Sequence, residues 1–108
     1  MPQIIDKSAD EIQSWVKSNS ACLIDVREDS EFAVERIPNT DMHMPLSRFN
    51  PKDIPLNSPK KLVFVCSQGV RSLQIGQYLL DNEFLNEAYN LKHGIVGWNG
   101  AGLPIEKD

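Results

Sequence analysis

The sequence contains few cysteines and no long hydrophobic run, and both shortages narrow what the protein can be. Two cysteines, Cys22 and Cys66, are too few for a disulfide framework. The two thiols are compatible with a single bridge, but a reducing compartment with one reactive thiol is the simpler interpretation. No apolar stretch approaches the roughly 18 residues that a membrane span requires, and residues 1–7 lack the basic and apolar segments of a secretory signal. We therefore expect a cytoplasmic protein with no membrane partner.

Positive charge is also in short supply. The chain has 11 Lys and Arg residues against 15 Asp and Glu residues, which gives a net charge of −4 at pH 7. The basic residues are scattered, and Lys60-Lys61 is their only adjacent pair. Binding to a nucleic-acid backbone needs a clustered basic surface, so we expect no nucleic-acid partner. With 41% hydrophobic residues, the composition is that of one globular domain over residues 1–108.

The stretch that organises the chain surrounds Cys66. Residues 61–65 contain the β-branched and aromatic run 63–65 and predict a buried strand, and residues 71–80 read as a helix. A cysteine between a parallel strand and a helix stands where α/β sheets place their chemistry. The backbone N–H groups of the loop and the positive end of the helix favour an anion there. We therefore expect Cys66 to ionise more readily than a free thiol and to act as a nucleophile.

The rest of the chain alternates between expected strands and helices, which favours an α/β fold with one parallel sheet. Ser8 fits the N-cap of a first helix, with Glu11 reaching back to it, while Asp29 or Ser30 is expected to cap a second. Asn82 is expected as a left-handed C-cap of the helix after Cys66. The further strands are expected at residues 4–5, 22–26, 41–45 and 88–91, a helical turn at 46–50, and a closing helix around Ile95 and Trp98.

Two polar residues in or beside these strands raise separate questions. Asp25 ends an apolar strand and needs a partner, for which Arg27 and Arg71 are the candidates. Direct contact of Asp25 with substrate is the alternative, and we favour the structural ion pair. His43 lies between two methionines, but one histidine without a second ligand at a zinc-like spacing gives poor support for a metal. We therefore expect no metal.

Four segments together resemble the rhodanese-like sulfurtransferase family in its single-domain form, and they follow the family's order over nearly the whole chain. Residues 23–32 resemble D-V-R-x-x-x-E-[FY], and residues 37–45 resemble H-I-P-G-A-x-N-I-P. Residues 66–72 are similar to the active loop C-x-x-G-x-R-S, and residues 94–104 resemble the ending G-G-x-x-x-W-x-x-A-G-L-P. The chain departs from the pattern at several positions, including His93 in place of the first glycine of the final pair. The nucleophile is not among these departures.

This resemblance implies a rhodanese-like fold with about five parallel strands and helices on both faces of the sheet. It implies a thiosulfate sulfurtransferase in which Cys66 takes the outer sulfur of a small anionic donor such as thiosulfate as a persulfide. A thiol, a partner protein or, in an assay, cyanide then accepts that sulfur, and no cofactor is required. The loop residues that would hold the persulfide are Ser67, Gln68, Gly69, Val70, Arg71 and Ser72, and the supporting residues are Asp25, Arg27 and Glu31.

Arg71 has two alternative roles within this interpretation. It attracts the anionic donor, or it braces the loop by pairing with a carboxylate such as Asp25 or Glu31. We favour the bracing role, because a guanidinium can donate two parallel hydrogen bonds to one carboxylate. His93 is expected to be a surface turn residue, and an influence on acceptor docking is the alternative.

Three other functions remain open at this stage. A cysteine phosphatase or arsenate reductase also holds a cysteine in an anion-binding loop, but phosphatase loops are one residue longer than the four residues between Cys66 and Arg71. A non-catalytic rhodanese-like binding module is expected to lose the cysteine, which is kept here. A persulfide carrier for a partner enzyme has the same sequence features as a small-molecule sulfurtransferase.

Overall fold

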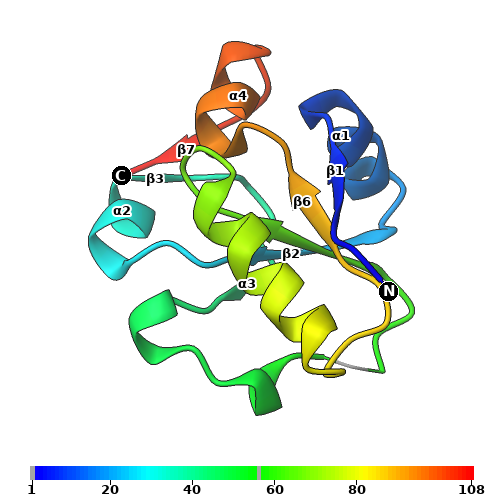
Figure 1. Ribbon diagram of the computed structural model, residues 1–108. Coiled ribbons are helices and arrows are strands. Elements are labelled where there is room, and N and C mark those ends of the chain that lie inside the picture. The colour runs from blue at the N-terminus through cyan, green and yellow to red at the C-terminus, as the bar shows by residue number, and fades with distance from the viewer. Residues whose placement is uncertain (1, 56) are drawn as a thin grey trace.

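The computed structural model describes residues 2–55 and 57–108. It shows an α/β fold with a five-stranded parallel sheet in the order β1-β6-β5-β2-β4 (Figure 1). The expected fold class is therefore confirmed, and the strand that precedes Cys66 is the central one. The strands of this sheet are β1 (Ile5–Lys7), β2 (Ala21–Asp25), β4 (Met42–His43), β5 (Lys61–Val65) and β6 (Tyr89–Leu91).

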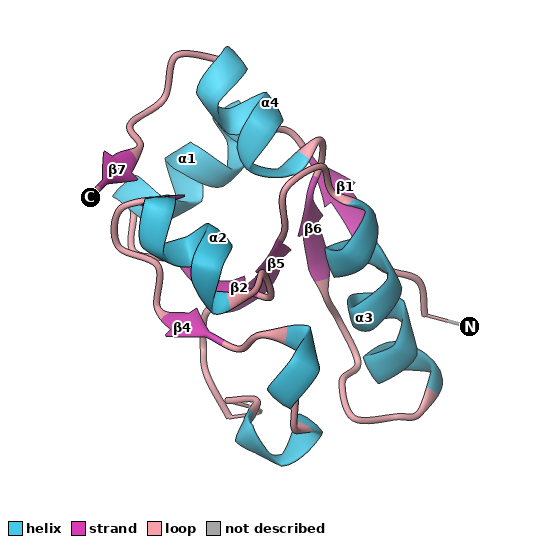
Figure 2. Ribbon diagram, turned by 90° about the vertical axis from the view of Figure 1, so that its left-hand side faces the viewer, coloured by secondary structure: helices cyan, strands magenta, loops and turns pink. Residues whose placement is uncertain are grey.

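Helices cover both faces of the sheet, as expected (Figure 2). Helices α1 (Ala9–Lys17) and α4 (Gly94–Gly100) lie on one face, and α3 (Val70–Asp81) lies on the other. The shorter elements are α2 (Asp29–Val34), the 3-10 helices at Leu46–Arg48 and Pro51–Asp53, and the strands β3 (Glu35–Arg36) and β7 (Glu106–Lys107). No helix within the described ranges is long and apolar enough to cross a membrane.

Alternation along β5 explains the two hydrophobic cores. Successive strand side chains point to opposite faces, so Val63 and Val65 pack with α1 and α4, while Phe64 and Cys66 pack on the side of α3. All four are buried, as the continuous apolar run predicts for a central parallel strand. Because side chains alternate along β5, Cys66 faces the same side of the sheet as Phe64, which is the side covered by α3.

The predicted caps are partly right. Ser8 caps α1 and its hydroxyl accepts a hydrogen bond from the Glu11 amide (3.2 Å), which confirms that prediction. The cap predicted for α2 is wrong, because Glu28 occupies the N-cap in a reciprocal capping box with Glu31. The short side chains of Asp29 and Ser30 made them the better candidates in sequence. The longer Glu28 side chain is held in place by Ser47, whose hydroxyl donates to it at 2.5 Å.

Two features at chain reversals were also predicted wrongly or missed. Asn82 follows α3 with φ −97°, and the left-handed residue is Glu83 with φ 61°. No local pattern predicted the antiparallel pairing between β3 and β7, which joins residues about seventy positions apart. Arg36 of β3 also forms ion pairs with Glu106, its partner in the register (2.9 Å), and with Asp108 (3.0 Å).

Candidate active site

Cys66 follows β5 directly, and a tight loop leads from it into α3. Gly69 caps that helix in the left-handed conformation, with φ 88°. A side chain on Gly69 would come within 3.0 Å of the His93 amide nitrogen, so both the φ angle and the space favour glycine. The loop lies between α2 and α4 in Figure 1.

Helix α4 fixes the first two peptide groups of the loop. The Ile95 amide donates to the Cys66 carbonyl and the Val96 amide donates to the Ser67 carbonyl, both at 3.0 Å. Both carbonyls are therefore hydrogen-bonded to α4. The amide of Gly69 points inwards and donates to the Cys66 sulfur at 3.1 Å.

The Cys66 side chain is fully buried, and its surroundings favour the thiolate. Burial is the largest single influence on the pKa of this thiol and acts to raise it. Hydrogen bonds act in the opposite direction, first from the Ser72 hydroxyl at 3.2 Å and then from the amides of Ser72, Gly69 and Gln68. Their combined effect is larger, so the pKa of Cys66 lies below its ordinary value.

A pocket of about 280 Å³ lies beside Cys66. Arg71 does not pair with Asp25, and its guanidinium binds Glu31 of α2 in a bidentate ion pair at 2.8 and 2.9 Å. This pair lowers the pKa of Glu31 to about 2, so Glu31 is charged throughout the neutral range. The pocket is lined by Glu31, Cys66, Ser67, Gln68, Val70 and Arg71.

Asp25 takes the other candidate partner, Arg27. Their side chains are 1% and 4% exposed, and they form an ion pair at 3.0 Å. The Arg27 guanidinium also donates to the carbonyl of Glu35 at 2.6 Å and to that of Glu31 at 3.4 Å, so the pair anchors α2. In register, Asp25 lies beside Val65, one residue before the thiol. The buried pair thus connects the end of the sheet to the helix that carries Glu31.

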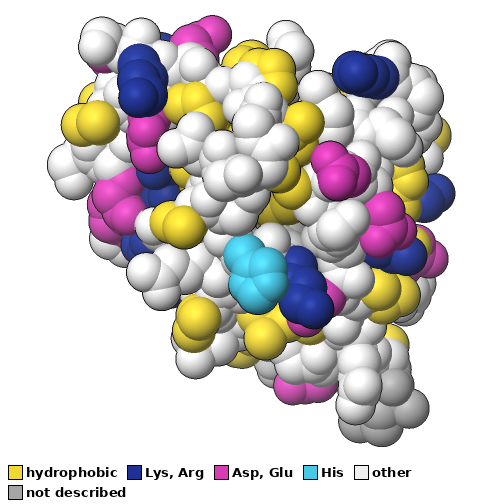
Figure 3. Space-filling model, turned by 90° about the horizontal axis from the view of Figure 1, so that it is seen from above, with side chains coloured by type: hydrophobic (Ala, Val, Ile, Leu, Met, Phe, Trp, Pro, Cys, Tyr) yellow, Lys and Arg dark blue, Asp and Glu magenta, His cyan; other side chains and the backbone are white. Residues whose placement is uncertain are grey.

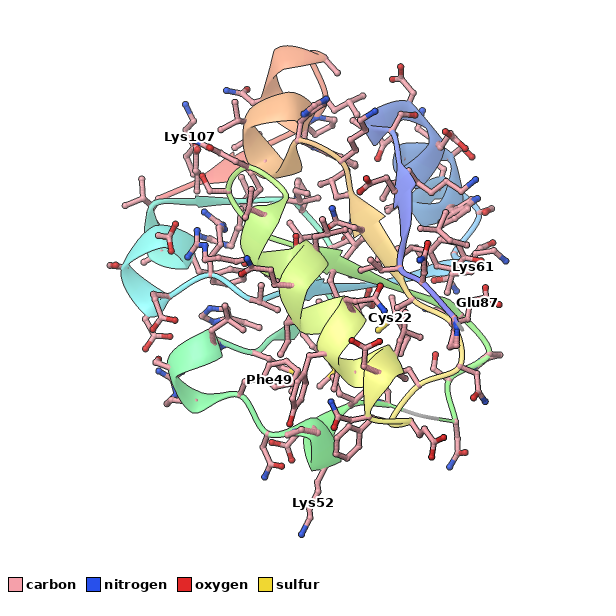
Figure 4. All side chains as sticks on the ribbon, viewed as in Figure 1. Cys22, Phe49, Lys52, Lys61, Glu87 and Lys107 are labelled. Carbon is pink, nitrogen blue, oxygen red and sulfur yellow. The ribbon has the colours of Figure 1, made fainter. Side chains whose placement is uncertain are left out.

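The two cysteines lie apart, and both are free thiols. Cys22, labelled in Figure 4, lies behind the later turns of α3, whereas Cys66 precedes the first turn. Burial raises the pKa of Cys22, in contrast to that of Cys66. Cys22 is therefore a core residue, as expected from its place in the strand.

The two histidines lie outside the pocket lining. His43 stacks on Phe32, and its Nε2 lies 2.8 Å from the Arg27 carbonyl, so it supports the loop before α2. His93 is an exposed left-handed residue in the turn before α4. Among residues 2–55 and 57–108, no three His, Cys, Asp or Glu side chains gather as a metal site requires.

Sequence reasoning missed Asn90, which lies in β6 and is 2% exposed. Its amide nitrogen donates to the Gly69 carbonyl (3.1 Å), and its oxygen accepts from the Ser72 hydroxyl (2.5 Å). The available signal was a polar residue inside a short apolar strand, since a buried amide needs partners. Asn90 is in register with Phe64, so it faces the α3 side of the sheet as Cys66 does.

The surface seen from above Figure 1 carries charges of both signs (Figure 3). On that face the Lys and Arg side chains are separated by acidic, apolar or uncharged ones and form no continuous basic area. Near the pocket, Arg71 is neutralised by Glu31. The face shown thus offers no basic track of the kind that a nucleic-acid backbone requires.

Placing a methyl group on Gly94 should displace the active loop. Gly94 has φ 56°, and a Cβ there would lie 2.3 Å from the Cys66 carbonyl oxygen and 2.5 Å from that of Ser67. We expect Gly94→Ala to raise the pH midpoint of Cys66 alkylation and to destabilise the protein by about 1–3 kcal/mol, because the amides that stabilise the thiolate move. The control is Gly100→Ala in the same helix, where a Cβ meets no atom within 4 Å. Equal behaviour of the two variants would contradict this account of α4.

Comparisons with known proteins identify the family to which this chain belongs. The family model described as rhodanese-like domain matches residues 8–101, so the chain belongs to the rhodanese-like family. It is 35% identical over 82 residues to YtwF of Bacillus subtilis, covering 76% of this chain and 77% of that protein. It is 27% identical over 96 residues to the thiosulfate sulfurtransferase GlpE of Actinobacillus pleuropneumoniae, covering 87% of each.

A solved structure agrees with these sequence matches. The rhodanese-related protein of Thermoplasma volcanium superposes with a TM-score of 0.79 at 25% identity, covering 96% of this chain and 99% of that one. Sequence and structure therefore agree on the family, and sulfur transfer is the activity that its named members point to.

Proposed function

We propose that this protein is a sulfurtransferase that carries sulfane sulfur as a persulfide on Cys66. The observation that carries the proposal is the buried thiol of a pocket-lining cysteine, whose sulfur lies 3.1 Å from the Gly69 amide nitrogen and 3.2 Å from the Ser72 hydroxyl oxygen. Such donors stabilise a thiolate and so provide a nucleophile near neutral pH. The similarity to a thiosulfate sulfurtransferase supports thiosulfate as a donor.

The proposed reaction has two half-reactions. In the first, the Cys66 thiolate attacks the outer sulfur of thiosulfate and forms a sulfur–sulfur bond. The bond to the sulfonate sulfur breaks, and sulfite leaves as a dianion with the electron pair of that bond. The transferred sulfur keeps the negative charge that it carried in thiosulfate and becomes the terminal sulfur of a Cys66 persulfide. In the second, a nucleophile such as cyanide attacks that terminal sulfur, the new sulfur–sulfur bond breaks, and the Cys66 thiolate is restored. No external oxidant or reductant is needed.

The active loop suits a small charged sulfur. Only four residues separate Cys66 from Arg71, so the loop is narrower than a phosphate-binding loop with one residue more. In the proposal, its inward N–H groups hold the terminal persulfide sulfur as an oxyanion hole holds an oxygen. The residues of this loop are Ser67, Gln68, Gly69, Val70, Arg71 and Ser72.

Arg71 acts in this proposal as a brace of the loop. Both terminal nitrogens of its guanidinium are bound to Glu31, whose helix is anchored by the Asp25–Arg27 pair. An arginine held in this way positions the first turn of α3 and leaves less of its charge for a donor. Asp25, Arg27 and Glu31 therefore support the site without touching the reacting sulfur.

Replacing Arg71 by lysine should weaken both half-reactions. A lysine cannot reproduce the bidentate pair with Glu31, so the loop shifts, and we expect each rate to fall by about tenfold to a hundredfold. Stopped-flow measurement of sulfur loading and unloading tests this. Arg48→Lys is the control, because it removes a bidentate pair with Asp29 (2.8 and 3.1 Å) at the exposed surface. A rise confined to the KM for thiosulfate would assign Arg71 to donor binding instead.

The partners proposed are a small anionic donor and a thiol or protein acceptor. A free, reactive thiol also requires a reducing compartment, so we propose the cytoplasm as the place of action. The chemistry described needs no cofactor, and the same site serves a persulfide carrier that delivers sulfur to a partner enzyme.

Intact-protein mass spectrometry tests the proposal. Treatment with thiosulfate should add one sulfur atom to the protein, and later treatment with cyanide should remove it and release thiocyanate. No adduct on folded protein would overturn the proposal. Hydrolysis of an aryl phosphate that is lost in Cys66→Ser would then favour a phosphatase, and a Cys66 that resists alkylation in the native state would favour a binding module.

A further inference from the structure

The Ser72 hydroxyl has two acceptors for one proton. Its oxygen lies 3.2 Å from the Cys66 sulfur and 2.5 Å from Oδ1 of Asn90, and all three residues are buried. A hydroxyl can donate only one hydrogen bond, although it can accept two. While Ser72 donates to Asn90, it can accept from the Cys66 S–H, but it cannot stabilise a thiolate.

The side chain of Asn90 is held with its oxygen towards Ser72. Its amide nitrogen donates to Oδ1 of Asp6 at 2.8 Å and to the Gly69 carbonyl at 3.1 Å. Turning the amide over would direct its oxygen at both of these acceptors. Asp6 stands opposite Asn90 in the register of β1 and β6, so the sheet itself maintains this contact. Asn90 is therefore a fixed acceptor for the Ser72 proton.

We propose that Asn90 is a positioning residue whose carbonyl oxygen competes with the Cys66 sulfur for the single Ser72 proton and so sets how readily Cys66 ionises. When the Cys66 proton leaves to solvent, the Ser72 hydroxyl turns from Asn90 to the sulfur. Oδ1 of Asn90 then loses its donor, and this loss opposes ionisation. The free energy of ionising Cys66 therefore includes the cost of leaving Oδ1 of Asn90 without the Ser72 donor.

Several charged side chains surround the cluster of Cys66, Ser72 and Asn90, and neutral substitutions of Ser72 or Asn90 leave all of these charges unchanged. Two ion pairs, Asp25–Arg27 and Glu31–Arg71, lie on the β2, α2 and α3 sides. Asp6 lies behind Asn90, and His93 precedes α4. With neutral substitutions at positions 72 and 90, a shift in the ionisation of Cys66 therefore reports the hydrogen bond of the Ser72 hydroxyl and not a change in nearby charge.

A double-mutant cycle on the pH profile of Cys66 alkylation tests the proposal. Iodoacetamide is the probe, and peptide mapping separates Cys66 from Cys22. Ser72→Ala should raise the midpoint, because a donor to the sulfur is lost. Asn90→Leu should lower it by about half to one pH unit, because Ser72 is then free to donate to the sulfur. In the Ser72→Ala background, Asn90→Leu should have no effect, since the competition no longer exists.

A purely structural role for Asn90 predicts a different pattern. It would shift the midpoint equally in both backgrounds, and such a result, or a raised midpoint in Asn90→Leu alone, would overturn the proposal. If Asn90→Leu does not fold, Asn90→Ala takes its place, because it also removes the acceptor for the Ser72 proton and adds no charge. We expect its midpoint to lie below that of the wild type, and a higher one would overturn the proposal.

This inference deepens the proposed function, because it takes Cys66 as the nucleophile. The alkylation profile needs no sulfur donor or acceptor, so the two proposals fail separately. A cycle with the expected pattern on a protein that takes no sulfur from thiosulfate would leave the role of Asn90 in place and overturn the proposed reaction alone.

Discussion

Replacing Cys66 by alanine should abolish sulfur loading while the protein stays folded. The proposed first half-reaction forms a bond to this sulfur atom, and no neighbouring side chain can replace it. In the pocket lining, Ser67 carries a hydroxyl and Gln68 an amide, and Ser72 beside the thiol carries a hydroxyl. We expect the rate of thiocyanate formation to fall by at least about a thousandfold, to the level of the uncatalysed reaction. The mass of the variant should not change on treatment with thiosulfate.

Cys22→Ala is the matched control for this experiment. Cys22 is also a buried free cysteine, 7% exposed, but it lies in β2 and burial raises the pKa of its thiol. The control should load and release sulfur as the wild type does, after correction for any loss of stability from the cavity, about 1 kcal/mol for so small a side chain. Sulfur loading that survives in Cys66→Ala and disappears in Cys22→Ala would overturn the assignment of the nucleophile.

Local sequence patterns predicted the central elements well, because their determinants lie close together in the chain. Val63, Phe64 and Val65 are β-branched or aromatic, and residues 61–65 form the middle strand. The alternation of that strand places Phe64 and Cys66 on the α3 side. The Ser8 cap needs only the Glu11 amide three residues later. In both cases the interactions that determine the local structure form between residues a few positions apart in the chain.

The errors concern features that depend on distant partners. Glu28 caps α2 because Ser47, nineteen residues later, holds its carboxylate. The pairing of β3 with β7 depends on contacts such as Arg36 with Glu106, which are seventy residues apart. Single-sequence patterns do not show which residues meet over such separations, so local propensity was the only available guide and it was insufficient.

The site shows the same division. The position of Cys66 follows from one strand and one loop, but the partner of Arg71 depends on where α2 lies. Asp25 and Glu31 were both plausible carboxylates, and the structure pairs Arg71 with Glu31 because Arg27 already occupies Asp25. Asn90 was missed because its importance comes from three other elements, through Asp6, Gly69 and Ser72.

Asp25→Asn should destabilise the protein more than any surface substitution near the site. Asp25 is 1% exposed, and its carboxylate accepts from the Arg27 backbone amide (2.9 Å) and from the Arg27 guanidinium (3.0–3.2 Å). The asparagine keeps the shape but leaves the Arg27 charge buried without compensation. Removing one partner of such a pair costs about 3–5 kcal/mol of unfolding free energy. Urea denaturation at pH 7 measures this loss.

The same substitution should also reach the active loop, because Arg27 connects Asp25 to the carbonyls of Glu31 and Glu35 in and after α2. If α2 is held less firmly, Glu31 in that helix also positions Arg71 less firmly. Sulfur loading should therefore slow in Asp25→Asn even where the protein is fully folded. Glu106→Gln is the control, since it removes an ion pair with Arg36 that is exposed to solvent and far weaker for that reason. If the two variants lose the same small amount of stability, the buried pair is not the anchor of α2, and the connection from the sheet to Arg71 must run through other contacts.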